Sequence, residues 1–465
     1  MNAVAEILSR IRGIVGQAGL VDRDQYPAHL NDRRGYYEGQ AQLIVQPKDA
    51  AEVGAIVALC GESGITIVPQ GGNTGLCGGA TPDSSGKQIV LSLSKLNTIR
   101  EIDVKNHTAV VESGVILAHL HESVSSEGLM FPLDLGARGS CQVGGNLSTN
   151  AGGINVLRYG NARDLVLGLE VVLPDGRIWN GLSKLRKDNT GYDLKQLFIG
   201  AEGTLGIITA AVLKLFPAPA QRHTAFIAVR DPVAACDLLV AARRMSADAL
   251  VSFEYVPRLA LDLVGGDPLD GVYEHYILLE LVSGIADTLY QQQMETFLEQ
   301  GMESGNILNG TIAYSGIQRD QLWHLREAIS PAQKESVKND VSVPISSIPE
   351  FLRQAPEVVE AIAPGSRPCP FGHIGDGNIH YNILGPEDMD PDVFRNTFGQ
   401  RLSGGINQLV MSMDGSFSAE HGVGQLRRGE LYEYKDSLDI ELMQRIKTAI
   451  DPDGVLNPGK ILQVR

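Results

Sequence analysis

The chain has 465 residues, of which 43% are hydrophobic, and its 55 acidic and 39 basic side chains give a formal net charge of −16. This length exceeds one ordinary hydrophobic core and predicts two or three globular domains. No run of lysine or arginine could follow a phosphate backbone, so nucleic acid is excluded as an expected partner. The five cysteines are scattered without a Cys-x-x-Cys pair, which favours a reducing compartment and predicts a cytoplasmic protein.

The first predicted element is an amphipathic helix over residues 1–20. Val4, Leu8, Ile11 and Val15 recur at helical spacing with charged residues between them, unlike the uncharged centre of a secretion signal. Packing on the body of the protein is favoured over contact with a membrane surface. No apolar run approaches the roughly 20 residues needed to cross a bilayer, so we expect no transmembrane segment.

The rest of the chain alternates strand and helix patterns. Residues 41–217 are rich in glycine and read as an α/β arrangement, and the prolines at 217 and 219 mark a boundary. An α+β region suited to a cap follows, and then a short tail. We therefore predict domains 1–217, 218–415 and 416–465. The predicted strands are 43–45, 65–68, 89–93, 109–112, 167–173, 207–216, 249–254, 272–279 and 341–345, and the predicted helices are 49–62, 117–126, 233–245, 285–301, 318–336, 348–362, 391–411 and 440–450.

Three glycine-rich loops are candidates for binding an anion or a polar cofactor. The first, residues 69–75, follows an apolar run, and its bare backbone amides can surround a diphosphate, although it matches neither a Walker A nor a Gly-x-Gly-x-x-Gly motif. The second, residues 132–153, has so few large apolar groups that its polar groups need an outside partner. The third, residues 200–208, leads into a strand. A purely structural loop is the alternative for the first.

Two histidines flank a predicted hairpin turn at Asp376-Gly377. A two-residue type I′ turn there would place His373 directly opposite His380, with their Cβ atoms roughly 5 Å apart. Two imidazoles on one face can bind one divalent cation, and Asn382 points the same way. The alternative is a pair of ordinary surface or core histidines.

A further segment, residues 416–424, supplies a carboxylate and a histidine in a glycine-containing loop. Glu420 can serve as a third ligand beside His373 and His380. A His₂Glu set with an open position is the pattern of a catalytic divalent site. His421 would then remain available as a base.

These motifs, in this order and spacing, resemble the FAD-linked D-2-hydroxyacid dehydrogenases of the vanillyl-alcohol oxidase and para-cresol methylhydroxylase superfamily, over essentially the whole chain. The resemblance implies an α+β fold: an FAD-binding domain of two subdomains, a ferredoxin-like substrate cap and a C-terminal segment that returns to the flavin. Asn73-Thr74 stand where some relatives carry a flavin-linked histidine, so noncovalent FAD is expected. The implied cofactor residues are Pro69, Gly71, Gly72, Asn73, Thr74, Gly75, Leu76, Pro132, Gly144, Gly145, Ser148, Thr149, Asn150, Gly152, Glu202, Gly203, Ile208 and Asn457.

The same resemblance assigns the polar residues outside the loops. The family's metal ligands match His373, His380 and Glu420, with zinc expected, although His₂Glu also suits Mn²⁺, Fe²⁺ and Co²⁺. The family's base matches His421. An arginine can hold a carboxylate bidentately, whereas a lysine acts as a mobile point charge. The implied substrate-binding residues are Arg326, Ser330, Lys338, Asn382 and His421.

The expected reaction is oxidation of a D-2-hydroxy acid to the 2-oxo acid, with the hydride passing to flavin N5 and the hydroxyl proton to His421, assisted by the metal. Arg326 and Lys338 together favour a dicarboxylate, D-2-hydroxyglutarate, with D-malate and D-lactate as near relatives. The alternatives are a D-lactate or glycolate dehydrogenase that prefers monocarboxylates, a metal-dependent hydrolase and a noncatalytic flavin-binding subunit. The resemblance implies an electron-transfer flavoprotein or a quinone as acceptor, and the frequency of symmetric dimers favours a homodimer.

Overall fold

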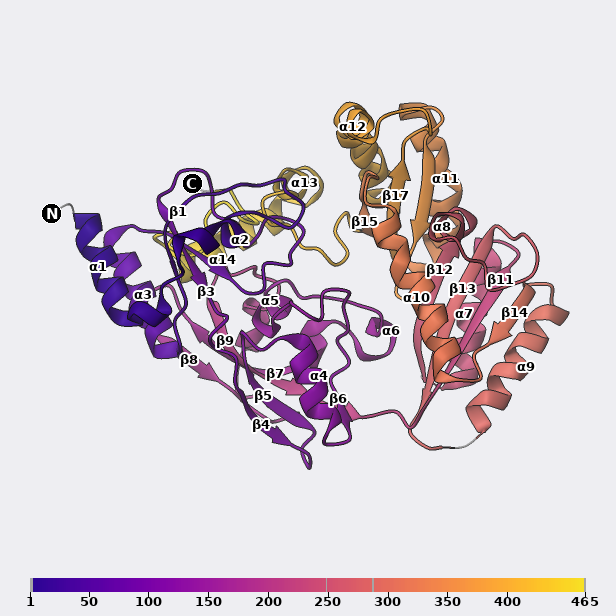
Figure 1. The fold of residues 1–465 in the computed structure, drawn as a ribbon, viewed down its shortest axis with the longest axis horizontal. Coiled ribbons are helices and arrows are strands. Elements are labelled where there is room, and N and C mark those ends of the chain that lie inside the picture. Colours follow the sequence, from indigo (N-terminus) through magenta and orange to yellow (C-terminus); the bar gives the residue numbers. More distant parts are fainter. Residues whose placement is uncertain (1–2, 248, 287, 464–465) are drawn as a thin grey trace. The chain divides into compact units, whose positions relative to one another are not determined.

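The computed structural model describes residues 3–247, 249–286 and 288–463. They form two compact units. The first unit comprises residues 1–153, 160–218 and 420–465, and the second comprises residues 154–159 and 219–419. Figure 1 follows the chain through both units. The predicted helix over residues 1–20 is α1 (Ala3–Val15), and residues 1–2 lie outside the described part.

The first unit is built on two sheets. The smaller is parallel, with strand order β1-β3-β2, and the larger is antiparallel, with order β4-β5-β9-β7-β8. The short strands β6 and β10 pair separately. The strands are β1 (Ala41–Val45), β2 (Ile67–Gln70), β3 (Gln88–Ser92), β4 (Ile99–Asp103), β5 (Thr108–Glu112), β6 (Leu129–Met130), β7 (Val166–Val172), β8 (Ile178–Gly181), β9 (Ile207–Lys214) and β10 (Phe216–Pro217).

Helix α3 shows why these elements form where they do. The side chain of Asp49 accepts a hydrogen bond from the backbone N–H of Glu52, which caps the first turn, and Gly64 ends the helix in the left-handed conformation. Its buried face packs with the parallel sheet, so the end of β2, where the first glycine-rich loop begins, is fixed. The helices of this unit are α1, α2 (Tyr26–Leu30), α3 (Ala50–Ser63), α4 (Leu117–Ser125), α5 (Val143–Ser148), α13 (Arg428–Tyr434) and α14 (Ser437–Ile450).

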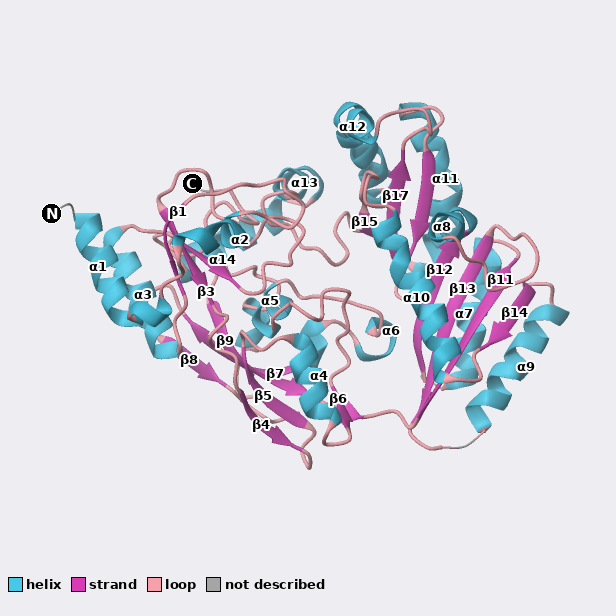
Figure 2. Cartoon of the chain, in the orientation of Figure 1, coloured by secondary structure: helices cyan, strands magenta, loops and turns pink. Residues whose placement is uncertain are grey.

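The second unit contains a ferredoxin-like sheet (Figure 2). Its strands follow the order β12-β13-β11-β14, every neighbouring pair is antiparallel, and α7 and α9 make the crossovers. Alternate residues of β11 point to opposite faces: Ile227 packs with α7 and α9, whereas Phe226 packs with α8 and α10. The elements are β11 (Gln221–Val229), α7 (Pro232–Ser246), β12 (Leu250–Pro257), α8 (Arg258–Val264), β13 (His275–Ser283), α9 (Leu289–Glu303), β14 (Ile307–Ile312) and α10 (Gly316–Ala332).

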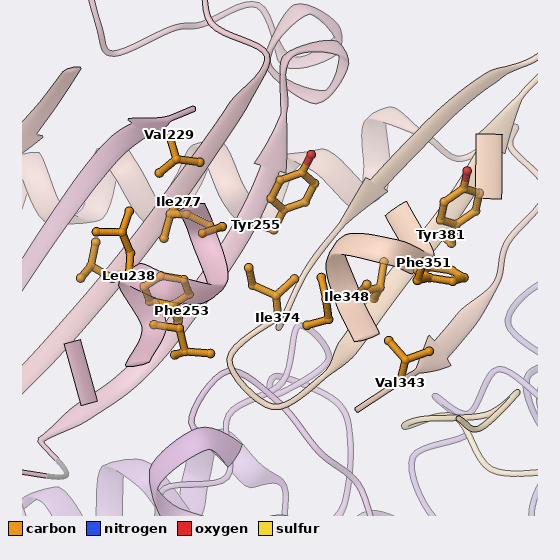
Figure 3. Packing of buried hydrophobic residues seen from close by; sticks show 14 of the residues in the cluster. Val229, Leu238, Phe253, Tyr255, Ile277, Val343, Ile348, Phe351, Ile374 and Tyr381 are labelled. Atoms are coloured by element: carbon orange, nitrogen blue, oxygen red, sulfur yellow. The ribbon is translucent and has the colours of Figure 1, made fainter. Parts of the chain in front are cut away.

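A second, three-stranded sheet in this unit has the order β15-β17-β16. Figure 3 shows that its core is continuous with that of the ferredoxin-like sheet, since Phe351 and Tyr381 belong to the same buried cluster as Phe253 and Tyr255. The rings of Phe351 and Tyr381 meet edge to face, with centroids 5.4 Å apart. The elements are β15 (Asp340–Ser342), α11 (Ile348–Ile362), β16 (Arg367–Phe371), β17 (Asn378–Leu384) and α12 (Pro391–Met411), and the short α6 (Val156–Tyr159) also belongs to this unit.

The predicted α+β fold class, with its ferredoxin-like cap, is confirmed. The helices predicted at 348–362 and 391–411 have those bounds. The reading of residues 132–153 as a loop throughout was wrong, because α5 lies inside it. The cause is close packing: a Cβ on Gly144 would lie 2.5 Å from the Cβ of Ser113, so this glycine lets a helix approach a neighbouring segment. No helix in the described residues is long and apolar enough to cross a membrane.

Candidate functional site

A pocket in the first unit brings the three glycine-rich loops together. The first loop has its own anchor: the side-chain amide of Asn73 donates to the carbonyls of Ala28 (3.1 Å) and Asn31 (2.9 Å). It also runs close to its neighbours, because a Cβ on Gly72 would lie 2.0 Å from the carbonyl oxygen of Ser140. The lining residues are Pro69, Gln70, Gly71, Gly72, Asn73, Thr74, Gly75, Leu76, Cys77, Gly79, Ala80, Leu93, Gln142, Gly144, Gly145, Asn146, Ser148, Thr149, Glu202, Gly203, Gly206, Ile207, Ile208 and His421.

Four of the predicted cofactor residues, Pro132, Asn150, Gly152 and Asn457, are not in that lining. The buried Asn457 donates to the carbonyls of Gly79 (2.9 Å) and Glu202 (2.7 Å), so it ties its own segment to the third loop and to residues shortly after the first. Sequence reasoning missed several lining residues. Most lie within a few positions of the predicted ones, so widening each loop would have found them; Leu93 lies farther from the three loops in the sequence.

Glu202 anchors the segment that follows His421. Its Oε1 accepts a hydrogen bond from the backbone N–H of Val423 (2.7 Å) and its Oε2 accepts one from that of Gly424 (2.8 Å). Burial raises the pKa of this carboxyl to about 7, although the two backbone hydrogen bonds and the Lys460 charge oppose the shift. Glu202 and His421 line the same pocket, so the anchor holds a histidine-bearing segment at its wall.

The two predicted metal-ligand histidines of the second unit do meet, but not through the predicted pairing. Strand β17 places His380 opposite Phe371, so residues 372–377 form the connection and the two-residue turn at Asp376-Gly377 was wrong. Gly372 explains the difference. It exchanges backbone hydrogen bonds with Tyr255 of β12 (2.8 and 3.0 Å), which draws the chain away from β17 before the turn. The rings of His373 and His380 still lie with centroids 5.4 Å apart, at 77°.

Each histidine has a buried carboxylate at its Nδ1 atom. Glu254 Oε1 lies 2.7 Å from His373 Nδ1, and Asp340 Oδ1 lies 3.5 Å from His380 Nδ1. A carboxylate at Nδ1 favours a proton on that nitrogen and leaves Nε2 as a lone-pair donor, which is how histidines are oriented toward metals. Sequence reasoning missed both carboxylates. The signal for Glu254 was a single charge within the apolar run that became β12.

Glu254 also binds the predicted substrate arginine. Its Oε2 accepts from Nε of Arg326 at 2.8 Å, and Nη2 lies at the same distance. The guanidinium lies over the ring of Phe371, 4.9 Å from its centroid, and the arginine is buried. Burial would raise the pKa of Glu254, but the charges and hydrogen bonds of His373 and Arg326 outweigh it and lower the pKa to about 2.

The remaining predicted substrate residues divide into two groups. Asn382 donates from Nδ2 to Oε1 of the buried Gln333 (2.8 Å), and Lys338 donates from Nζ to the backbone carbonyl of the same residue (2.5 Å). Gln333 therefore connects them, and sequence reasoning missed it. Ser330 is exposed on α10, one turn after Arg326.

Glu420 follows the second unit directly in the chain. The preceding residue, Ala419, donates its backbone N–H to the carbonyl of Asp340 (3.2 Å), and Asp340 pairs with His380 across β15 and β17. Glu420 itself opens the last segment of the first unit. Within that unit its carboxylate lies against Gly152, where a Cβ would be 2.8 Å from Oε1, so the glycine leaves room for the acid.

Comparison with known proteins identifies the class. Residues 41–181 match the family described as FAD binding domain, and residues 218–461 match FAD linked oxidases, C-terminal domain. The p-cresol methylhydroxylase structure superposes with a TM-score of 0.76 at 16% identity, covering 100% of this chain and 98% of that one, which shows the fold.

Curated relatives extend along nearly the whole chain. A rice (Oryza sativa subsp. indica) protein named probable D-2-hydroxyglutarate dehydrogenase, mitochondrial, is 38% identical over 98% of this chain and 81% of its own length. A Stutzerimonas stutzeri D-2-hydroxyglutarate dehydrogenase is 37% identical over 95% of each, and a Saccharomyces cerevisiae D-2-hydroxyglutarate–pyruvate transhydrogenase is 36% identical over 98% and 94%. The chain therefore belongs to the FAD-linked D-2-hydroxyacid dehydrogenase family, as its motifs predicted, and is an FAD-dependent oxidoreductase.

Proposed function

We propose that this enzyme oxidises D-2-hydroxyglutarate, or a near relative such as D-malate or D-lactate, to the 2-oxo acid. The observation that carries the proposal is the polar cluster of the second unit, in which one buried carboxylate, Glu254, joins the imidazole of His373 to the guanidinium of Arg326. Such a cluster suits an anionic substrate that also binds a metal ion. The printed names of relatives at 36–38% identity support the same substrate class.

The pocket of the first unit is the proposed site of noncovalent FAD. Its wall of glycine backbone suits a diphosphate, because unhindered N–H groups can approach the anion closely. The predicted loop residues that line it would hold the cofactor, whereas Asn457 would act by fixing the loops. Asn150, whose side chain accepts from the backbone N–H of Arg163 (2.9 Å), has a similar local role.

The proposed metal ligands are His373, His380 and Glu420. Glu254, hydrogen-bonded to Nδ1 of His373, fits this role because it leaves Nε2 of that imidazole for the ion, and Asp340 lies 3.5 Å from Nδ1 of His380. The hydrogen bond from Ala419 to Asp340 supports Glu420 as the third ligand, because it fixes the residue before it at the strand next to His380. Zinc is the proposed ion, and the open position of a His₂Glu set would take the substrate.

When bound, the flavin would take the hydride from the substrate Cα, and the metal ion would make the substrate hydroxyl more acidic. His421 is the proposed acceptor of the hydroxyl proton, and Glu202 holds the backbone that follows it. Arg326 and Lys338 are the proposed carboxylate clamps, with Asn382 and Ser330 as polar contacts. Two cations match a dicarboxylate better than D-lactate, which has one carboxylate.

The proposal extends to the oligomeric state, the cellular compartment and the electron acceptor. A cytoplasmic homodimer is proposed, and the five scattered cysteines, which include no Cys-x-x-Cys pair, support a reducing compartment. An electron-transfer flavoprotein or a quinone is the proposed acceptor, and the printed name of the yeast relative adds pyruvate to the acceptors worth assaying. Light scattering of the purified protein and reoxidation by each acceptor test these points.

An anaerobic absorbance spectrum recorded before and after adding D-2-hydroxyglutarate tests the central proposal. Bleaching of the long-wavelength flavin band is the expected result. A band that persists with D-2-hydroxyglutarate but bleaches with D-lactate or glycolate would move the substrate to monocarboxylates. A band that resists every hydroxy acid would favour the noncatalytic flavin-binding alternative.

A further inference from the structure

We propose that Glu254 is a positioning residue that sets a proposed metal ligand, His373, and a proposed substrate clamp, Arg326, in one fixed geometry. The inference rests on the proposed function. It adds a residue that contributes no atom to the metal or the substrate, yet governs both of the side chains that do. Its failure is distinguishable from failure of the proposed function, because each has its own measurement.

The two oxygens of Glu254 serve different partners. Oε1 lies 2.7 Å from Nδ1 of His373, and Oε2 accepts from Nε of Arg326 at 2.8 Å. Both partners present N–H donors, so the bridging group must accept on both sides. A carboxylate does so, whereas an amide of the same shape would turn its NH₂ group toward one of the two donors. Charge and shape are therefore both required at this position.

Backbone hydrogen bonds fix the distance between Glu254 and His373. The neighbours of these two residues, Tyr255 and Gly372, exchange a pair of backbone hydrogen bonds, and Gly375 N–H donates to the carbonyl of Phe253 (3.1 Å). The connection between β16 and β17 is thus held along β12 on both sides of His373. Glu254 is 1% exposed, so water does not compete for its oxygens.

This arrangement orients the ligand-binding atoms. With Nδ1 of His373 directed at Glu254, Nε2 points away from the carboxylate and toward the proposed metal. Arg326 presents one edge to Glu254 and stacks on Phe371, which leaves the opposite edge of its planar group for a substrate carboxylate. The spacing between metal and clamp then depends on Glu254.

The chain offers a matched control in Glu280 of β13. It is also buried, at 3% exposed, and it occupies the face of the same sheet that α10 covers. Its carboxylate binds Arg222 (2.6 Å), Thr224 (2.8 Å) and the indole N–H of Trp323 (2.9 Å), none of which is a proposed ligand or clamp. Glu280→Gln therefore reproduces the loss of a buried, ion-paired carboxylate without touching the site.

The test compares Glu254→Gln, Glu254→Asp and Glu280→Gln with the parent enzyme, each purified with FAD. Zinc affinity is measured by equilibrium with metal-buffered solutions, and KM and kcat are measured with D-2-hydroxyglutarate. Glu254→Gln is expected to lose about 10- to 100-fold in zinc affinity and to raise KM, with flavin content unchanged. Glu254→Asp keeps the charge but has a shorter side chain, so its zinc affinity and KM are expected to lie between those of Glu254→Gln and the parent. Glu280→Gln is expected to match the parent in both quantities.

Two results would overturn the inference. One is a Glu254→Gln enzyme that keeps the parent's zinc affinity and KM, and the other is an equal loss in Glu280→Gln, which would show general damage. If Glu254→Gln fails to retain flavin or native circular dichroism, the Asp variant decides by the same criteria. A parent that binds no zinc would contradict the proposed metal site, and KM would then decide the role of Glu254. A parent that D-2-hydroxyglutarate does not reduce would contradict the proposed substrate, and zinc affinity would then decide.

Discussion

The pocket of the first unit and the polar cluster of the second are built from different parts of the chain. The pocket is lined largely by glycine-rich backbone, with Glu202 and Asn457 as buried anchors. The cluster consists of charged side chains that meet from β12, α10 and the connection before β17. A backbone site can be read from local composition, whereas a side-chain site depends on which strands become neighbours. The pocket and the polar cluster should therefore respond differently to substitution.

The largest effect is expected for His421→Ala. Loss of the proposed base should lower kcat by about 10²- to 10⁴-fold, while the flavin stays bound because the substitution leaves the glycine loops intact. Stopped-flow reduction of the flavin by D-2-hydroxyglutarate measures the rate, and the absorbance spectrum measures flavin content. A variant that reduces its flavin at the parent's rate would remove His421 from the chemistry.

The next largest effect is a pH dependence of the free energy of unfolding that comes from Glu202. Its folded-state pKa of about 7 lies above the ordinary value of 4.5, so the folded protein holds a proton between these pH values that the unfolded chain has lost. The contribution of Glu202 to the free energy of unfolding is fully present below pH 4.5, and it falls by about 3 kcal/mol as pH rises through 7. Thermal unfolding of the apo-protein between pH 5 and 8 should show this slope, and Glu202→Gln should flatten it. An unchanged slope in the variant would assign it to other groups.

Substitution of the first glycine-rich loop should act through backbone clashes. In Gly72→Ala the new Cβ would meet the carbonyl oxygen of Ser140 at 2.0 Å, whereas nothing lies within 4 Å of a Cβ on Gly75. The first change should cost about 1–3 kcal/mol of apo-protein stability, and Gly75→Ala should cost much less. Chemical unfolding followed by fluorescence makes the comparison. Equal losses in both variants would contradict a site shaped by close backbone packing.

The smallest effect tests the clamp. Lys338→Met should raise KM for D-2-hydroxyglutarate by about tenfold, because a single lost ion pair of this kind is worth about 1.4 kcal/mol. KM for D-lactate, which has one carboxylate, should change little. Steady-state assays with both substrates are sufficient. A parallel rise for the two substrates would place Lys338 outside the recognition of the second carboxylate.

Sequence reasoning reached the fold class and the glycine-rich loops because both have local signatures. Helices α11 and α12 have the bounds predicted from the sequence, and bare amides identified the loop at 69–75. The register at His373 failed because the Asp-Gly preference was overridden by a tertiary contact, the pairing of Gly372 with β12. Glu254 was missed for the same reason, since only the folded sheet brings it to His373 and Arg326.

The path of the chain has a consequence for how the protein is made. The anchor residue Asn457 bonds to Gly79, 378 residues earlier, and the backbone of Asn457 donates to the carbonyl of Ile67. The segment that carries His421 likewise reaches Glu202 from more than two hundred positions away. The ribosome therefore synthesises the whole second unit before residues 420–465 of the first unit. Contacts between residues so far apart in the sequence form late, and such contacts slow folding. During synthesis the glycine-rich loops are made before the segment that carries His421, so the pocket they line is incomplete until that segment follows.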